Sequence, residues 1–106
     1  MINILTGKVL ERKLSGRDLS HSFFFVLEVH PDHLHAVQLS EIDEPDPETY
    51  PGLQTGFSRP DLSEEAFKRA STQTAVRFEI VGNEIRDRLG TTLTLWDGER
   101  KPYRYC

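Results

Sequence analysis

The residues Phe23-Phe24-Phe25-Val26-Leu27-Glu28-Val29 have the strongest strand character in the chain, because aromatic and β-branched side chains fill this run almost completely. Alternate side chains of a strand point to opposite faces, so Phe23 and Phe25 lie on one face while Phe24 and Val26 lie on the other. Both faces are therefore apolar. A strand of this kind is covered on both sides. We expect it at the centre of the fold, with the core on one face and a helix or a second copy of the chain on the other.

Further strands are expected on both sides of this central run. Apolar and polar residues alternate in four other segments, residues 2–14, 34–42, 75–81 and 91–96. Residues 84–89 fit either a helical turn or a strand extension. A short helix is predicted near residues 62–70, with Asp61 as its cap and Glu64 completing a capping box.

The order of these elements predicts a mainly β domain of five or six antiparallel strands, closed or nearly closed into a small barrel. The helix falls between the third and fourth strands, and in this element order the chain resembles the OB-fold. Closure would also remove the unpaired edges that an open sheet of such strands would expose.

Length and composition restrict the class of protein. The chain has 106 residues, the size of one domain, and 37% of them are hydrophobic. No segment approaches the ~20 consecutive apolar residues of a membrane helix, and no secretory signal is recognisable. The single cysteine, Cys106, excludes an internal disulfide and a zinc site made of thiolates. We therefore expect a single cytoplasmic domain over residues 1–106, with an exposed thiol at Cys106.

Negative charge is concentrated in one part of the sequence. The formal net charge is −4, but residues 41–65 carry eight acidic side chains against Arg59 alone, and residues 66–106 are mildly basic. Residues 43–60 also contain four prolines, which predicts a long irregular loop. Long loops on a rigid scaffold often carry function. Its acids would steer a basic protein surface, and the candidates are Asp43, Glu44, Asp46 and Glu48; simple solvation of the loop is the alternative.

A second candidate surface lies near the C-terminus. Asp97-Gly98 is a strong two-residue turn, so residues 91–96 and 99–105 are expected to pair as a hairpin. In that register, one face presents Trp96, Lys101, Tyr103 and Tyr105. Aromatic and cationic side chains on an exposed face bind either a protein partner or single-stranded nucleic acid. The alternative is that these aromatic side chains pack under the acidic loop and close one end of the barrel.

The histidines form a third candidate. Three of the four fall in the segment His30-Pro31-Asp32-His33-Leu34-His35, where a turn meets the start of a strand. His33 and His35 would share one face of that strand, and His30 or Asp32 could supply a further metal ligand. The alternative is a polar turn without a metal.

These observations predict a non-enzymatic module without a cofactor that binds a protein partner, as inhibitors, immunity proteins and adaptors do. No nucleophile elbow, phosphate-binding loop or HExxH pattern is present in the sequence. One alternative is an OB-type binder of single-stranded nucleic acid that uses Arg77, Lys101 and Arg104 for phosphates and Trp96 and Tyr103 for bases. The other alternative is a small metal-binding protein that uses the histidine turn.

Overall fold

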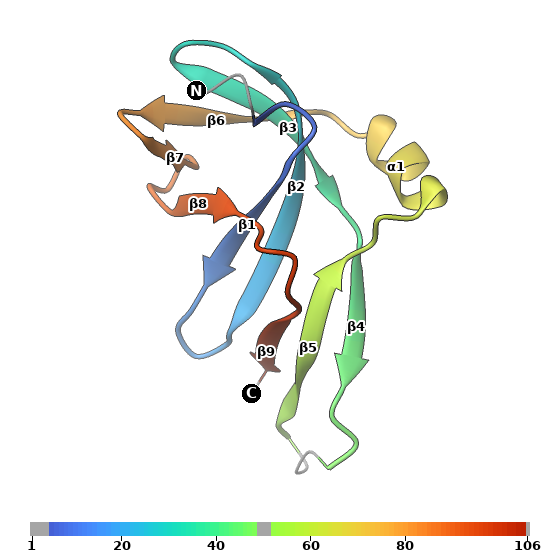
Figure 1. Ribbon diagram of the computed structural model, residues 1–106. Coiled ribbons are helices and arrows are strands. Elements are labelled where there is room, and N and C mark those ends of the chain that lie inside the picture. Colours follow the sequence, from blue (N-terminus) through green and yellow to red (C-terminus); the bar gives the residue numbers. More distant parts are fainter. Residues whose placement is uncertain (1–4, 49–51, 106) are drawn as a thin grey trace.

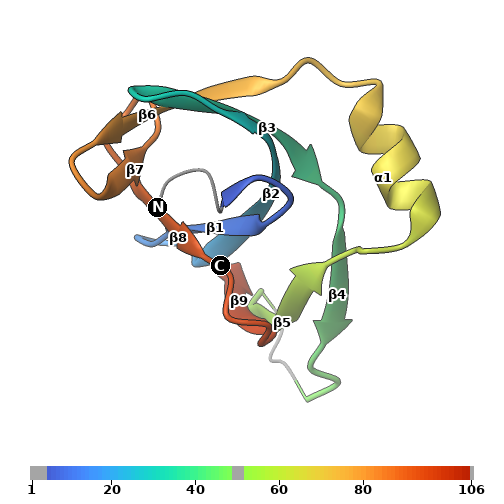
Figure 2. The same cartoon turned by 45° about the horizontal axis from the view of Figure 1, so that its top comes forward.

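The computed structural model describes residues 5–48 and 52–105. Its main body is a closed antiparallel barrel in which each strand pairs with the next and the last pairs with the first (Figures 1 and 2). The barrel strands are β1 (Val9–Leu14), β2 (Ser20–Val29), β3 (His33–Leu39), β6 (Val76–Val81), β7 (Glu84–Arg86) and β8 (Thr92–Leu95). The prediction of a small, mainly β barrel is confirmed, and residues 84–89 begin as a strand rather than a helical turn.

The helix α1 (Glu64–Ser71) comes between the third and fourth barrel strands in chain order, as the sequence predicts. The barrel itself is a meander, because neighbours in the sheet are also neighbours among the barrel strands in sequence. An OB-fold is a Greek-key barrel. The likeness to the OB-fold is therefore one of element order.

The interior of the barrel is filled by alternate side chains of the six strands. The buried residues are Leu10, Phe24, Val26, Leu34, Ala36, Phe78, Ile85 and Leu93. The rings of Phe24 and Phe78 meet edge to face with their centroids 4.9 Å apart. Such aromatic pairs add to the free energy gained from burial alone, so this contact is a main support of the core.

The second face of β2 is covered by the chain itself. Phe23 belongs to a second buried cluster to which α1 contributes Ala70, and the rings of Phe25 and Phe67 meet edge to face at 5.1 Å. The prediction of a helix over this face is confirmed, so the two-faced strand does not require a second copy of the chain. The helix cap differs from the prediction: Ser63 is the N-cap and its hydroxyl accepts from the Ala66 amide, because Asp61 lies outside the first turn and accepts from the Ser63 amide.

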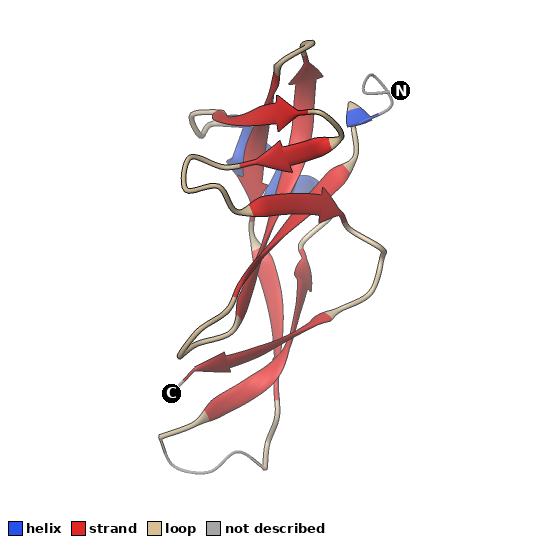
Figure 3. Cartoon of the chain, turned by 90° about the vertical axis from the view of Figure 1, so that its left-hand side faces the viewer, coloured by secondary structure: helices blue, strands red, loops and turns tan. Residues whose placement is uncertain are grey.

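A three-stranded antiparallel sheet extends from one side of the barrel (Figure 3). It consists of β4 (Glu41–Pro45), β5 (Gln54–Pro60) and β9 (Lys101–Tyr105), in the order β4-β5-β9. The prediction of an irregular loop over residues 43–60 is wrong for most of this segment. Pro45 and Pro60 lie at the ends of their strands, where a missing amide donor is tolerated. Residues 49–51 of the predicted loop lie outside the described residues.

The predicted hairpin between residues 91–96 and 99–105 is also wrong. β8 pairs with β1 and β7, whereas β9 pairs with β5. The chain bends at Gly98, which has a positive φ of 87°, but this bend leads the chain from the barrel to the second sheet. Similarly, the predicted strand 34–42 is divided at Ser40 between β3 and β4. A local turn signal does not specify which strands it joins.

None of the helices in the described part of the chain has the length and apolar composition needed to cross a membrane.

Candidate functional sites

The four residues predicted for an aromatic face do not share one surface. Trp96 is partly buried against Phe23, with the ring centroids 6.0 Å apart, and its indole Nε1 donates to the Glu99 carbonyl at 2.7 Å. Tyr103 is buried, with 7% of its surface exposed, and only Tyr105 beside it is substantially exposed. The Lys101 ammonium lies 2.8 Å from Asp97 and 3.5 Å from Glu11. The packing alternative therefore holds for Trp96 and Tyr103.

The predicted acidic residues are divided between the two faces of the β4-β5-β9 sheet. Strand register places Asp43 opposite Ser58 and Glu44 opposite Phe57, so these neighbours point to opposite sides. Asp43 shares its face with Tyr103 and Tyr105. Asp46 and Glu48 follow β4 in the connection to β5, where the Glu48 amide donates to Asp46 Oδ1 at 2.9 Å.

On the Asp43 face, burial and negative charge act together. Burial raises the pKa of Tyr105 above its ordinary value, and the nearby carboxylates of Glu41 and Asp43 raise it further. Burial and then Asp43 raise the pKa of Tyr103 in the same way. Desolvation also raises the pKa of the Glu41 carboxyl, with Asp43 adding to the effect. Both tyrosine hydroxyls therefore keep their protons to a higher pH than an unperturbed tyrosine does.

On the Glu44 face lies a cluster that the sequence did not reveal. The Arg100 guanidinium lies over the Phe57 ring at 4.1 Å, and Phe57 is 38% exposed. Arg100 Nη1 also donates to Glu44 Oε2 at 2.8 Å, and Arg59 Nε lies 3.4 Å from Glu44 Oε1. We call Glu44, Phe57, Arg59 and Arg100 the arginine–phenylalanine cluster. The sequence did hold one sign of this cluster: Thr55, Phe57 and Arg59 alternate with small residues, which is typical of a strand. The surrounding prolines obscured this pattern.

A hollow of about 570 Å³ adjoins this cluster. Its walls come from β4, β5, β9 and the segments before β2 and β9, and include Leu19, Pro102 and Arg104 as well as Phe57 and Arg100. Its lining combines apolar residues with charged ones. Such a combination suits the side chains of a protein partner better than free solvent.

The histidine turn is more ordered than a simple polar turn requires. His33 and His35 lie on the same face of β3, and His30 precedes the turn, with its ring stacked on His33 at 4.5 Å. Each of the three residues offers a ring nitrogen within 4.8 Å of the other two. Asp32 is the fourth residue predicted here, and its Oδ1 lies 2.6 Å from His33 Nδ1.

A carboxylate that the sequence did not single out joins the histidine group. Glu28 Oε1 lies 2.6 Å from His35 Nδ1 and 3.3 Å from His30 Nε2. These hydrogen bonds, to His35 first and then to His30, lower the pKa of the Glu28 carboxyl, and the bond to His33 lowers that of Asp32. The five side chains form what we call the histidine cluster: Glu28, His30, Asp32, His33 and His35.

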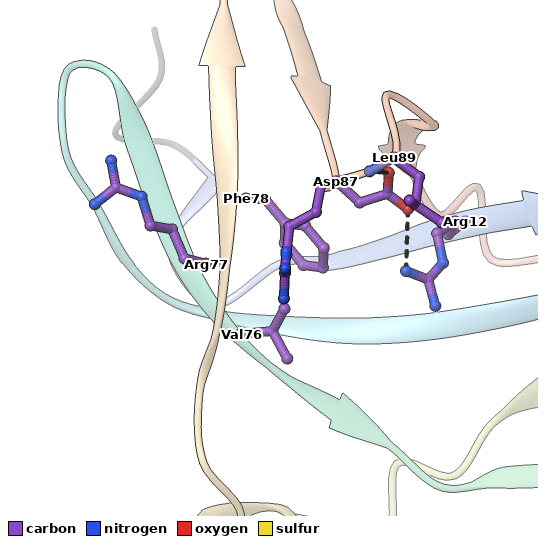
Figure 4. Close-up of a pocket in the computed structure, with 7 residues that line it drawn as sticks. Arg12, Val76, Arg77, Phe78, Asp87 and Leu89 are labelled. Atoms are coloured by element: carbon purple, nitrogen blue, oxygen red, sulfur yellow. Dashed lines mark hydrogen bonds and ion pairs between the residues drawn. The ribbon is translucent and has the colours of Figure 1, made fainter.

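Another hollow, of about 410 Å³, lies between β1, β6 and the turn after β7 (Figure 4). Arg12 Nη1 donates to Asp87 Oδ2 at 3.2 Å, and Asp87 Oδ1 accepts from the amides of Leu89 and Thr91. Both carboxylate oxygens are thus used in holding the turn against β1. Figure 4 also shows Arg77 directed away from this pair. The Asp87 carboxylate therefore has a structural role.

Comparisons of the chain with protein-family models, with curated proteins and with solved structures find no match. The choice among the candidate sites therefore rests on their geometry. Two sites combine exposure with ordered polar groups: the arginine–phenylalanine cluster and the histidine cluster.

Proposed function

We propose that the chain is a non-enzymatic cytoplasmic module that binds a protein partner, in the manner of an inhibitor, immunity protein or adaptor. The arginine–phenylalanine cluster carries this proposal. An aromatic ring that is 38% exposed beneath an arginine, beside a hollow with both apolar and charged lining, has the composition of a protein interface hot spot. The cytoplasmic location rests on the single cysteine.

The charges around the cluster indicate how a partner would approach. Glu44 is held by Arg59 and Arg100, so it orients those arginines and does not act as a free negative charge. Asp46 and Glu48, which are exposed in the connection after β4, are better placed to attract a basic surface. The proposed partner therefore has a basic surface patch and an apolar side chain that enters the hollow next to Phe57.

The acidic strand β4 makes a further contribution. It pairs with β5 on one side only, and its residues include Glu41, Asp43 and Pro45. Charged side chains and proline on an edge strand discourage pairing with other strands. Recognition through side chains on the face of the sheet is therefore favoured over addition of a partner strand to this edge.

The OB-type alternative has less support. The residues it requires lie in separate places: Trp96 and Tyr103 are held in packing contacts, and Lys101 is paired with two carboxylates. Arg77 Nε donates to Glu79 Oε1 at 2.9 Å on the barrel. Stacking of bases needs aromatic rings and cations along one groove, and these residues do not supply it.

The test is a native capture experiment with matched variants. Wild-type chain, Phe57→Ala and Val81→Ala are used to capture proteins from lysate of the source cell, each with and without nuclease. Val81 is the control because it is an exposed apolar residue of the barrel, 52% accessible. Loss of an interface hot spot typically costs about 2 kcal/mol or more, so Phe57→Ala should reduce recovery of a stoichiometric partner at least tenfold.

The possible outcomes distinguish the proposed protein partner from the nucleic-acid alternative. A protein retained by wild type and Val81→Ala, lost with Phe57→Ala and unaffected by nuclease supports the proposal. Equal recovery by all three proteins would exclude the arginine–phenylalanine cluster as the interface. Loss of all bound material on nuclease treatment would favour the nucleic-acid alternative.

A further inference from the structure

The histidine cluster is independent of the proposed protein interface, and its position follows from the barrel. Leu34 and Ala36 point into the core and are fully buried, so His33 and His35, which alternate with them on β3, must point outward. They are fixed on a strand whose inner face is packed. Sites built on packed strands hold their side chains more accurately than sites on loops.

An irregularity in β2 brings Glu28 to the same outer surface. The register pairs Val26 with Ala36 and then Glu28 with His35, so Leu27 is the additional residue of a β-bulge. In a regular ladder Leu27 would lie opposite His35. The bulge replaces an apolar neighbour of His35 with a carboxylate, and β-bulges commonly redirect a side chain in this way next to functional sites.

In each of the three imidazole rings, one nitrogen is bonded to the carboxylate of Glu28 or Asp32. Glu28 bonds His35 through Nδ1 and His30 through Nε2, and Asp32 bonds His33 through Nδ1. Among the described residues, no hydrogen bond involves the other nitrogen of these three rings. Metal-binding histidines almost always donate their second nitrogen to a carboxylate or carbonyl, which fixes the ring and its tautomer.

We propose that His30, His33 and His35 bind one divalent transition-metal ion of the type that imidazole favours, with Zn²⁺ as the reference, and that Glu28 and Asp32 position the rings. Zn–N bonds of about 2.0–2.1 Å place the nitrogens of a tetrahedral site about 3.3 Å apart. Each of the three rings has one nitrogen, Nδ1 or Nε2, that lies within 4.8 Å of a nitrogen of the other two rings. Side-chain rotations that move each atom by on the order of 1 Å would therefore bring them into range.

Three protein ligands leave a fourth position of the ion open to water or to an outside ligand. A hollow of about 510 Å³ lies beside the cluster, lined by Leu27, Glu28, His35, Thr74 and Ala75. The ion would therefore be reached from solvent. This arrangement differs from a closed structural site, which would use four protein ligands.

The test is calorimetric titration of the untagged, chelator-treated full chain with ZnCl₂, together with NMR of the histidine rings. One saturable site per chain is expected, and the ring signals of His30, His33 and His35 should shift together. His21 is an internal control, because it is buried on β2 and faces Glu11, Lys13 and Lys101 rather than the cluster. Absence of saturable binding, or an equal shift of His21, would overturn the proposal.

Variants test the ligands and the positioning residue separately. His33→Asn and His35→Asn should each weaken Zn²⁺ binding at least tenfold, and undiminished binding by both would contradict the site. Glu28→Gln should weaken it by about 10–100-fold, the usual effect of losing a carboxylate behind a metal-binding histidine. All three side chains lie outside the barrel core, so the urea midpoint of the metal-free chain should change little.

Glu79→Gln is the matched control for Glu28→Gln. Glu79 lies opposite His33 on β6, but its carboxylate pairs with Arg77, and among the described residues it forms no hydrogen bond or ion pair with a histidine. Its loss changes the local charge by the same amount without removing a support of a ring. A change of a few-fold at most is expected. Equal losses for the two variants would show that only charge matters and would reject the positioning role of Glu28.

Discussion

The barrel and the β4-β5-β9 sheet use the same antiparallel pairing, but they are held together in different ways. In the barrel, closure pairs every strand on both sides, and eight apolar residues are buried inside. In the second sheet, β4 has an unpaired edge, and the buried residues are mostly small, with Gly56, Ser58 and Pro60 on β5 and Tyr103 on β9. We therefore expect the barrel to supply most of the stability, and the surface of the second sheet to tolerate substitution without loss of the core.

The second sheet nevertheless depends on the barrel. Three short strands with little apolar burial are marginally stable alone. The sheet is tied to the barrel by a β-bridge between Leu19 and Arg104, whose amides and carbonyls exchange two hydrogen bonds of 2.8 and 2.9 Å. We therefore expect damage to the barrel to unfold the whole chain, and damage to the second sheet to remain local.

The largest effect is expected inside the barrel. Phe24→Ala removes a ring that is 2% exposed and packed edge to face on Phe78. Truncation of a buried phenylalanine costs about 3–5 kcal/mol, and urea denaturation followed by tryptophan fluorescence would measure it. Leu89→Ala is the control, since Leu89 is 92% exposed and should change stability by no more than about 0.5 kcal/mol. Similar losses in the two variants would contradict the assignment of the core.

A smaller and local effect is expected for Gly56→Ala. An added Cβ would lie 2.7 Å from the Tyr103 hydroxyl oxygen and would also meet the backbone carbonyl of Glu44. Overpacking of this kind costs about 1–3 kcal/mol. Hydrogen exchange should show faster exchange in β4, β5 and β9 with unchanged protection in the barrel. Gly16→Ala is the control, because nothing lies within 4 Å of its added Cβ and its φ is not positive; equal protection in both variants would refute the close packing.

Trp96→Ala tests the junction between the two regions. Trp96 follows β8, packs on Phe23 and bonds the Glu99 carbonyl in the connection to β9. It is only partly buried, so we expect a loss of about 1–2 kcal/mol, below the range for a fully buried aromatic residue. Urea denaturation and the capture experiment should show reduced stability with the partner still bound. Sharply weakened binding at unchanged stability would restore Trp96 as an interface anchor.

The smallest effect concerns pH and the boundary between barrel and sheet. Burial, outweighing the nearby Glu11 charge, lowers the pKa of His21 below its ordinary value of about 6.5, and Lys13 and Lys101 also lower it. As pH falls below about 6.5 the unfolded chain takes up a proton at this position that the folded chain does not, so stability declines. Above about pH 6.5, His21 is mostly neutral in both the folded and the unfolded chain, so it does not make the stability depend on pH.

His21→Leu should remove this part of the pH dependence. Thermal unfolding of wild type and variant between pH 8 and pH 5 would show the two melting temperatures diverging as the pH falls, with the wild type losing more. Carboxylates with lowered pKa values act equally in both proteins and cancel in the difference. Parallel curves would mean that His21 is solvated in the folded state.

The barrel could largely be predicted from the sequence, whereas the second sheet could not. Barrel strands such as β2 and β6 were predictable, because β2 is rich in aromatic and β-branched residues and β6 alternates apolar with polar ones. The pairing of β5 with β9 was not, since it joins residues as distant as Gln54 and Tyr105 through mostly polar strands. The prolines of residues 43–60 suggested a loop, because proline has no amide hydrogen to donate inside a sheet. Only the strand pairing shows that Pro45 and Pro60 lie at strand ends, where the missing donor is tolerated.

The candidate sites show a similar limit. His33 and His35 were predicted to share a face from their spacing alone. Glu28 could not be added to them, because the β-bulge in β2 reverses the face to which the residues after it point, and the sequence does not reveal the bulge. Phe57 and Arg100 meet only through the register of the second sheet. Cys106, predicted to be an exposed thiol, lies outside the described residues.

The closure of the barrel has a consequence for the speed of folding. The ring is completed by pairs such as Leu10 with Leu95, and β9 must reach β5 across about half that interval of sequence. Pairing of strands that are distant in sequence costs chain entropy before any stabilising contact forms. Topologies of this kind therefore fold in milliseconds to seconds. During synthesis neither sheet can be completed until β8 and β9 have emerged from the ribosome. The apolar faces of β2 therefore remain open to other chains for most of that time, and this interval is the main opportunity for aggregation.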